Sequence, residues 1–547
     1  MMKKLHYILL SIFLFASATD AQSQQFQRLY GGANQEISLV AFPSPAGGIY
    51  FLGATTSSGS GQADASIMKL DDNGQVIWAR TIGASFLDVG SSMTLAADGG
   101  LVCAGSTKSF NGNTPDDLYF FKVDSTGDMV WSKTFSAGEL DVATAILRTA
   151  DDGFAITGFT VVDSTRHVLL IRTDANGDTL FTRIYMGAGD EQGVEFFETA
   201  DGGFVITGKT FPQLPGEADI LLMRTDALGN VLWAKSYGES FWDEGAGVMQ
   251  LADSNYLISG STISFGQGNF DILLMKTDTA GNILWGKTYG GLYVDASYTA
   301  RENSDGSIVT SGYSNSLGYG HNLRMANSNQ AQGGDRGDDS TNVFLMKVNA
   351  VGDTIWTRTY GDGAQDEAFH FSKMQDGGYL LPGVSTSFTN TTDSTQMLVI
   401  RTDSLGHSGC HEQDGHPIID TTNFITQTLN FTVTSGFTET AVTSFSIPWN
   451  ESAEDACLYL GVNAIADRNF DVYPNPASGI INIKSEISGI EKMELYNILG
   501  ELIFSKIPST LSSETTMDVS GYVPGIYFLK LYTESLSATK KIIIQKN

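Results

Sequence analysis

Ten residues around position 410 concentrate the side chains that metal binding and nucleophilic chemistry use. The stretch from His407 to His416 holds three histidines, one cysteine and two acids. Imidazole and thiolate are preferred zinc ligands, so this spacing could hold a zinc ion. Cys410 can also pair with Cys457 across the Thr- and Phe-rich segment 411–456, because an isolated pair of cysteines forms a disulfide readily if the chain is exported. A bridged sulfur is no thiolate ligand, so we favour the Cys410–Cys457 disulfide and assign no metal site.

Carboxylates recur along the chain at a regular interval. They are Glu36, Asp88, Asp141, Glu191, Asp243, Asp295 and Asp366. Carboxylate oxygens suit hard cations, so a ring of these acids could hold Ca2+, the only cofactor that we leave open. The turn at 174–178 also looks like a calcium loop, but it lacks the later Glu of an EF-hand. Because every repeat has these features, we favour a folding role for them, in ion pairs between repeats and hydrogen bonds within turns.

Motifs typical of known enzyme chemistry are absent from the sequence. The chain has no Gly-x-Ser-x-Gly, no phosphate-binding loop and no His-Glu-x-x-His. His321 and His370 each stand alone, which is typical of ordinary packing or surface positions. The tripeptide Arg336-Gly-Asp338 matches one that integrins read, but a tripeptide arises readily by chance. We therefore assign no catalytic residue and expect a protein that is not an enzyme.

The recurring acids belong to a repeat of about fifty residues, whose clearest part is a turn followed by an aromatic strand. An Asp or Asn is followed three residues later by Gly and seven residues later by an aromatic residue, as in Asp71, Gly74 and Trp78. The aromatic positions are Trp78, Trp131, Phe181, Trp233, Trp285 and Trp356. A basic residue lies two positions after each of them.

The seventh copy of the repeat is completed from the other end of the chain. It begins at Asp403 and Gly406 but has Cys410 where the aromatic residue is expected. The aromatic residue and its basic–x–aromatic tail occur instead before the first copy, from Phe26 to Gly32. The repeats are therefore predicted to close into a ring in which residues 26–32 complete the last unit.

Each repeat fits four short strands joined by tight turns. Successive copies start 53, 50, 52, 52, 71 and 54 residues apart, and Asp, Gly and Asn mark turns within them. Four strands repeated seven times, without helical periodicity, predict an all-β fold with a seven-bladed β-propeller over residues 22–410. The 71-residue interval marks an insertion at 316–341, expected to be a long loop. Residues 411–464 are expected to form an appended β segment and linker.

The repeat resembles that of quinoprotein-type (PQQ-like) propellers, whose pattern is Ala-x-Asp-x-x-Thr-Gly-x-x-x-Trp. Residues 118–133 show the similarity. In this chain the turn of every copy is one residue shorter, and the adjacent Cys-Cys pair of the quinone dehydrogenases is absent. Those enzymes also usually have eight blades. The resemblance therefore implies the blade architecture and not the cofactor.

The beginning of the chain has the pattern of a secretory signal peptide over residues 1–21. Lys3 and Lys4 precede an apolar stretch, Tyr7–Phe15, and small residues follow as far as Ala21. No other stretch approaches the roughly eighteen apolar residues that are needed to cross a bilayer. We therefore expect an exported chain without a transmembrane segment.

The end of the chain differs in character from the repeats. Short alternating strands and turns predict a small immunoglobulin-like β-sandwich over residues 465–547. This segment resembles the C-terminal sorting domain (type A) of the type IX secretion system of Bacteroidetes. The matching residues are Tyr473, Pro474, Asn475, Pro476, Gly525, Lys540 and Lys541. The resemblance implies the type IX secretion machinery as a partner, and a mature protein that is secreted or held at the outer-membrane surface.

Charge narrows the choice of partners. The chain has 32 basic and 61 acidic residues, a net charge of −29, whereas nucleic-acid binding needs a basic surface. Loops on a rigid scaffold usually carry function, so we expect a monomeric propeller that binds glycan or protein through its loops. The alternative is a secreted polysaccharide-active enzyme, a hydrolase or lyase. Non-repeated carboxylates or histidines converging at one mouth of the channel would favour that alternative.

Overall fold

The computed structural model describes residues 25–458 and 470–545, apart from 33, 111–115, 212–216, 318–340, 363, 389–394, 450–452, 486–491, 498–501, 507–513 and 533–536. The predicted signal peptide and most of the predicted 316–341 insertion, with Arg336-Gly-Asp338 and His321, lie outside these residues. The chain forms two compact units, Met1–Cys457 and Leu458–Asn547, and each is described by itself.

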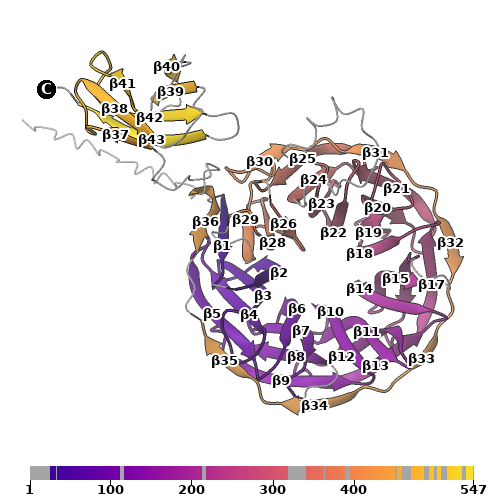
Figure 1. Cartoon of the computed structure of the whole chain (residues 1–547). Helices are drawn as coiled ribbons and strands as arrows, with labels where there is room; N and C mark the ends of the chain where they lie inside the picture. Colours follow the sequence, from indigo (N-terminus) through magenta and orange to yellow (C-terminus); the bar gives the residue numbers. More distant parts are fainter. Residues whose placement is uncertain are drawn as a thin grey trace, which may run out of the picture. The chain divides into compact units, whose positions relative to one another are not determined.

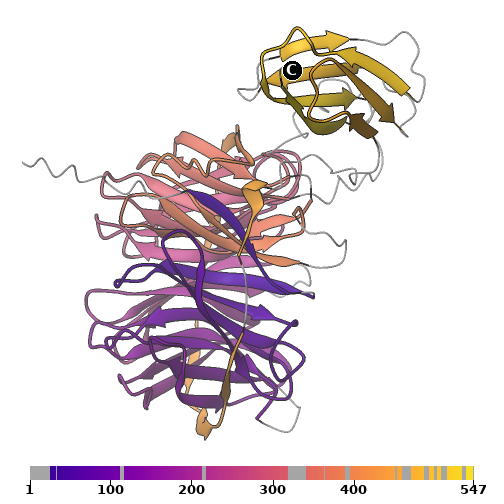
Figure 2. The ribbon, with the colours of Figure 1, turned by 90° about the vertical axis from the view of Figure 1, so that its left-hand side faces the viewer.

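Seven antiparallel sheets around a central axis build the first unit (Figures 1 and 2). Blade 1 contains β2 (Glu36–Pro43), β3 (Ile49–Thr55), β4 (Asp64–Leu70) and β5 (Val76–Gly83). Blade 2 contains β6 (Asp88–Leu95), β7 (Leu101–Thr107), β8 (Asp117–Val123) and β9 (Met129–Ser136). Blade 3 contains β10 (Leu140–Arg148), β11 (Phe154–Val162), β12 (Thr165–Thr173) and β13 (Thr179–Met186). The first strand of each blade lies nearest the axis and the fourth lies toward the outside.

The next three blades repeat this order. Blade 4 contains β14 (Asp190–Glu198), β15 (Phe204–Phe211), β16 (Asp219–Thr225) and β17 (Val231–Gly238). Blade 5 contains β18 (Asp243–Gln250), β19 (Tyr256–Thr262), β20 (Asp271–Thr277) and β21 (Ile283–Gly290). Blade 6 contains β22 (Asp295–Glu302), β23 (Ile308–Ser314), β24 (Asn342–Val348) and β25 (Thr354–Tyr360). The predicted all-β, seven-bladed fold is confirmed.

Blade 7 is assembled from both ends of the ring. Its inner strand is interrupted, as β26 (Asp366–Ala368) and β27 (Ser372–Lys373), and is followed by β28 (Tyr379–Ser385) and β29 (Gln396–Arg401). The fourth strand is β1 (Phe26–Tyr30), which pairs with β29 in the register Phe26 to Arg401. In β16 and most other middle strands the residues are buried, because neighbouring blades pack on both faces of each sheet.

A fifth strand on every blade comes from the segment after Cys410, where the sequence predicts an appendage. This segment runs backwards around the outer edge of the ring (Figure 1). It supplies β30 (Glu412–Asp414), β31 (Ile418–Thr421), β32 (Ile425–Thr428), β33 (Thr432–Thr434), β34 (Thr438–Val442), β35 (Phe445–Pro448) and β36 (Glu454–Asp455) to blades 6, 5, 4, 3, 2, 1 and 7. The 3-10 turn η1 (Ala456–Leu458) follows. We call residues 411–457 the belt.

The second unit is a small sandwich of two sheets. One sheet contains β37 (Phe470–Tyr473), β38 (Ile480–Ser485) and β41 (Glu514–Asp518). The other contains β40 (Leu502–Lys506), β39 (Lys492–Asn497), β42 (Gly525–Tyr532) and β43 (Ser537–Ile544). Residues from both sheets, such as Ile481 and Leu529, form its core. The predicted all-β C-terminal domain is thus confirmed.

Candidate functional site

The repeated aromatic residue of one blade covers the turn glycine of the next. Trp78 of blade 1 lies against Gly127 of blade 2, where a Cβ atom would come within 2.8 Å of the indole ring. Gly127 also has a φ of +83°, so glycine is required there both by backbone conformation and by space. The equivalent pairs are Phe26–Gly74, Trp131–Gly177, Phe181–Gly229, Trp233–Gly281, Trp285–Gly352 and Trp356–Gly406.

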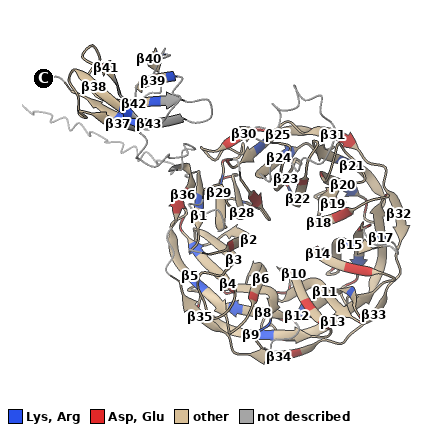
Figure 3. Ribbon diagram, viewed as in Figure 1, with Lys and Arg blue, Asp and Glu red and all other residues tan. Residues whose placement is uncertain are grey.

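The residues that follow the aromatic position hold the same turn. The Tyr237 hydroxyl donates to the carbonyl of Gly281 at 2.7 Å, and the Lys287 ammonium lies 2.7 Å from Asp353 of the next blade. The other recurring basic residue pairs within its own blade; examples are Lys122–Asp98, Arg224–Asp201 and Lys276–Asp253. Figure 3 shows basic residues on outer strands such as β5 and β9. The repeated residues therefore recur because they hold each blade together and join it to the next blade of the ring.

The seven recurring acids are buried at the start of the first strands. Asp243 accepts hydrogen bonds from Ser264 at 2.7 Å and from the Glu239 amide at 3.1 Å, and none of the seven is more than 2% exposed. Burial raises the pKa of Asp243, Asp295 and Asp366 to about 6. Their hydrogen bonds lie within the blade and its preceding loop, which accounts for their recurrence. Ca2+ binding by these acids stays a prediction.

The predicted disulfide between Cys410 and Cys457 is confirmed, with the two Cα atoms 5.5 Å apart. It removes the thiolate that a zinc site at 407–416 would need. His407 instead contacts Glu412 at 3.0 Å, and His411 contacts the carbonyl of Ala456 at 3.2 Å. Within the described ranges, no group of three or more His, Cys, Asp or Glu is placed to hold a metal ion.

A cavity of about 840 Å3 lies on the axis of the ring and is lined by the first strands. Most of these strands contain a β-bulge, which breaks the regular alternation and adds one residue to the inner surface. The bulge residues that line the cavity are Leu39, Ser91, Thr144, Val194, Ala246 and Tyr298. In blade 7, Phe369 and His370 line it between β26 and β27.

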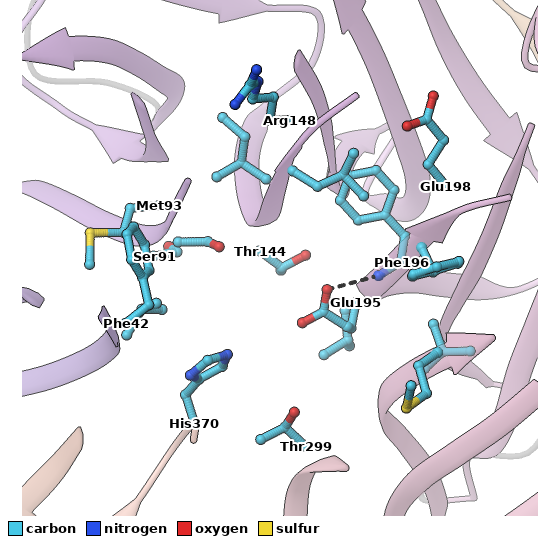
Figure 4. A pocket seen from close by; sticks show the side chains of 18 of the residues that line it. Phe42, Ser91, Met93, Thr144, Arg148, Glu195, Phe196, Glu198, Thr299 and His370 are labelled. Atoms are coloured by element: carbon cyan, nitrogen blue, oxygen red, sulfur yellow. Dashed lines mark hydrogen bonds between the residues drawn. The ribbon is translucent and has the colours of Figure 1, made fainter. Parts of the chain in front are cut away.

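Two residues that line this cavity have a buried polar atom without a protein partner. The Nδ1 atom of His370 and the hydroxyl of Thr299 are buried and have no hydrogen-bond partner in the described part of the chain. Figure 4 shows both around the same space as Thr144 and Glu195. Arg301 also lines the cavity; its guanidinium donates to the carbonyl of Ala300 at 2.9 Å and forms no ion pair with any described residue.

The surroundings of Glu195 and His370 shift the pKa values of both side chains. Burial raises the pKa of Glu195, and the nearby positive charge of Arg301 opposes that shift. Burial, with a smaller contribution from Arg301, lowers the pKa of His370 to about 3. His370 is therefore neutral at pH 7 and can exchange hydrogen bonds in either direction, depending on its tautomer.

A second group of non-repeated residues lies where the first strands begin. Glu244 contacts Lys209 at 2.6 Å and accepts from the Trp242 indole at 3.0 Å. Although burial opposes ionisation, Lys209 and these hydrogen bonds hold the pKa of Glu244 below its usual value. Burial raises the pKa of Glu367. Burial raises the pKa of Tyr298, and both carboxylates add to that shift; the Tyr298 ring is 5.4 Å from that of Phe369.

Sequence reasoning missed these residues because it followed the repeat. His370, which the sequence shows only as an isolated histidine, lines the cavity. A comparison of the seven first strands at one equivalent position could have found these residues. Four residues after each recurring acid stand Val40, Ser92, Ala145, Glu195, Gly247, Thr299 and His370. The departures at Glu195, Thr299 and His370 coincide with the polar cavity wall.

The residues that carry the sorting-domain resemblance meet at one edge of the second unit. The Asn475 side chain donates to the carbonyl of Lys541 at 2.8 Å and accepts from the amide of Ile543 at 2.8 Å. Gly525 pairs with Ile544 in the ladder between β42 and β43. Two peptide bonds in this motif, Tyr473–Pro474 and Asn475–Pro476, are cis. The motif thus holds the last strand of the chain.

Comparison with protein families identifies the C-terminal region. Residues 471–545 match the family model described as the secretion system C-terminal sorting domain. This match supports export by type IX secretion and a secreted or cell-surface location. No curated protein matches the chain. None of the described residues forms a helix long and apolar enough to span a membrane.

Solved structures show only weak similarity to the chain. Sqt1 from Chaetomium thermophilum is 11% identical, with a TM-score of 0.34 over 71% of this chain and 100% of that one. A eukaryotic initiation factor is 12% identical, with a TM-score of 0.26 over 63% and 98%. The tail fiber of Staphylococcus aureus phage P68 is 10% identical, with a TM-score of 0.22 over 83% and 93%. Similarity at this level carries no functional argument.

Proposed function

We propose that this protein is exported by type IX secretion and acts as a non-catalytic binding protein that takes part of a glycan into the axial cavity of its propeller. The sorting-domain match supports export. The observation that carries the binding role is a cavity wall in which His370 Nδ1 and the Thr299 hydroxyl have no partner among the described residues, and in which Arg301 has only a backbone partner. Buried polar groups are normally hydrogen-bonded, so these groups favour a ligand that supplies the missing partners.

The chemistry of the cavity suits sugar hydroxyls. A hydroxyl both donates and accepts, as required opposite the Thr299 hydroxyl, the neutral His370 ring and the Glu195 carboxylate. Phe42 and Phe196 also line the cavity and supply apolar surface from blades 1 and 4. The cavity volume of about 840 Å3 lies within the range of small-molecule sites. The cavity wall consists mainly of the first strands, so in this scheme the glycan contacts strands more than the loops expected from the sequence.

A matched pair of substitutions tests the binding proposal. Thr299→Val keeps the shape of the side chain and removes only its unpartnered hydroxyl, so the fold should tolerate it. Thr421→Val makes the same change on an exposed belt strand. On a glycan array, the wild-type chain and Thr421→Val should retain the same glycans, whereas Thr299→Val should bind them about tenfold more weakly, the effect of one lost hydrogen bond. Retention of no glycan, or equal binding by all three, would contradict the proposal.

A second candidate function is favoured by Glu244 and Glu367. Their pKa values shift in opposite directions, and both charges act on Tyr298. Two carboxylates with separated pKa values are typical of the acid and base of a polysaccharide-active enzyme. In such an enzyme Glu367 would be the acid and Glu244 the base or nucleophile.

Turnover separates the two functions. The purified chain would be incubated with a panel of polysaccharides, and release of reducing ends or unsaturated products would be measured. The binding proposal predicts no release. Release that is lost in Glu367→Gln and retained in Thr421→Val would establish the enzyme and overturn the non-catalytic role.

A further inference from the structure

The belt encircles the ring completely. After Cys410 the chain adds one strand to each of blades 6, 5, 4, 3, 2 and 1, and it then reaches blade 7, where β36 pairs with β1. Cys457 follows β36 by two residues and is bonded to Cys410, where the belt began. The disulfide joins two cysteines that are 47 residues apart in the sequence, and the covalent loop that it closes runs around the outside of all seven blades (Figure 1).

The belt has little slack. Between β30 and β35, successive strands are joined by only two or three residues. These connectors are themselves attached to the ring: the amide of Thr422 donates to Gly286 at 3.2 Å and that of Leu429 donates to Ala234 at 2.9 Å. An extended chain spans at most about 3.3–3.6 Å per residue, so a loop built mainly of strands cannot lengthen much.

Apolar side chains of the belt sit at the junctions between blades. Phe424 packs on the cluster shared by blades 4 and 5, Phe431 on that of blades 3 and 4, and Phe437 on that of blades 2 and 3. Val442 and Trp449 pack on the clusters of blades 1 and 2 and of blades 7 and 1. The belt therefore contacts the places where neighbouring blades would separate.

Without the disulfide, the end of the belt would be weakly held. The ladder between β36 and β1 has only two residue pairs, Arg28 with Asp455 and Leu29 with Glu454. The belt strands β31, β32 and β33 are exposed along their length. Without the disulfide the belt could detach from the ring starting at Cys457, where the chain leaves for the second unit, and the disulfide fixes that point.

We propose that the Cys410–Cys457 disulfide turns the belt into a closed hoop that holds the seven blades at a fixed circumference. Blades can separate at any junction only if the hoop opens or stretches. Because all seven blades line the axial cavity, the hoop also keeps the cavity wall in place. This role depends on chain connectivity and not on the identity of any ligand.

The experiment distinguishes a hoop from a local anchor. A specific protease site is inserted between Ser435 and Gly436, in an exposed connector of the full-length chain. Three states of this one variant are compared: uncut and oxidised, uncut and reduced with a dithiol, and cut with the disulfide intact. The readouts are the unfolding rate in denaturant and hydrogen exchange of the belt strands and the first strands.

Cutting the chain after Ser435 and reducing the Cys410–Cys457 disulfide should open a closed hoop equally well. We expect cutting and reduction each to raise the unfolding rate by about tenfold or more, in line with the loss of a long-loop disulfide, and to speed exchange on blades far from residue 436. If the cut, oxidised protein unfolds like the uncut, oxidised one, the disulfide is a local anchor and the proposal is wrong. Cys103→Ser serves as the thiol control, because Cys103 is buried and unpaired. A Cys410→Ser, Cys457→Ser double variant should behave as the reduced protein does.

Discussion

Gly127 and Gly99 have nearly the same backbone conformation in different surroundings. Their φ angles are +83° and +84°, but a Cβ atom at Gly127 would lie 2.8 Å from Trp78, whereas nothing lies within 4 Å at Gly99. Gly99→Ala should cost only the left-handed backbone, about 1–2 kcal/mol. Gly127→Ala should lose about 1–3 kcal/mol more, because it must displace the indole. Denaturant unfolding measures both, and equal losses would contradict the contact between blades.

Buried acids should make the stability of the ring depend on pH. Burial raises the pKa of Asp271 to about 7 and that of Asp295 to about 6. In the unfolded chain these groups ionise near pH 4. Between about pH 4 and 7 the folded chain binds more protons than the unfolded chain, so the free energy of unfolding falls as pH rises and then levels off.

Melting temperatures measured across this window test that dependence. We expect a higher melting temperature at pH 5 than at pH 8. Asp271→Asn cannot ionise and should reduce the difference between the two conditions. Glu139→Gln, at an exposed position whose charge does not act on Asp271, is the control and should leave most of the difference in melting temperature in place. A melting temperature that rises from pH 5 to pH 8 would show that these acids are not protonated in the fold.

At the scale of the elements, the four strands of each blade were predictable and the fifth was not. The first four alternate with Asp-Gly turns and recur seven times, so each copy of the repeat strengthens the prediction for the others. The belt strands have only two to five residues and face solvent, so they carry no long apolar run. Their signal is a shorter period, in which Phe424, Phe431 and Phe437 follow one another at seven and six residues. One such interval corresponds to one blade.

Phe431 tests whether the belt aromatics stabilise the junctions. Its ring lies 6.5 Å from that of Tyr185, in the cluster between blades 3 and 4. Phe431→Ala should lower the free energy of unfolding by about 1–3 kcal/mol, less than for a fully buried Phe, and should speed hydrogen exchange in β32 and β33. Val433→Ala, at a more exposed position of the same segment, should change it by about 0.5 kcal/mol or less. Equal effects of the two variants would argue against a wedge at the junction.

At the scale of the whole molecule, the ring could be predicted but its cavity could not. Ring closure follows from the incomplete seventh copy and the strand at residues 26–32, and both can be recognised in the amino-acid sequence. The cavity brings Thr144, Glu195, Thr299 and His370 together from blades 3, 4, 6 and 7. Their convergence depends on how the bulged first strands face the axis, which no local pattern encodes.

The two units should separate folding from export. Each has its own core, and the belt ends in a disulfide at Cys457, before the second unit begins at Leu458. Deleting residues 465–547 should therefore leave the melting temperature of the ring unchanged while the protein accumulates in the periplasm, because residues 471–545 carry the sorting domain. Cell fractionation and thermal unfolding of the purified ring measure the two results. Normal export of the truncated chain would overturn the sorting role, whereas a destabilised ring would show that the second unit also supports the propeller.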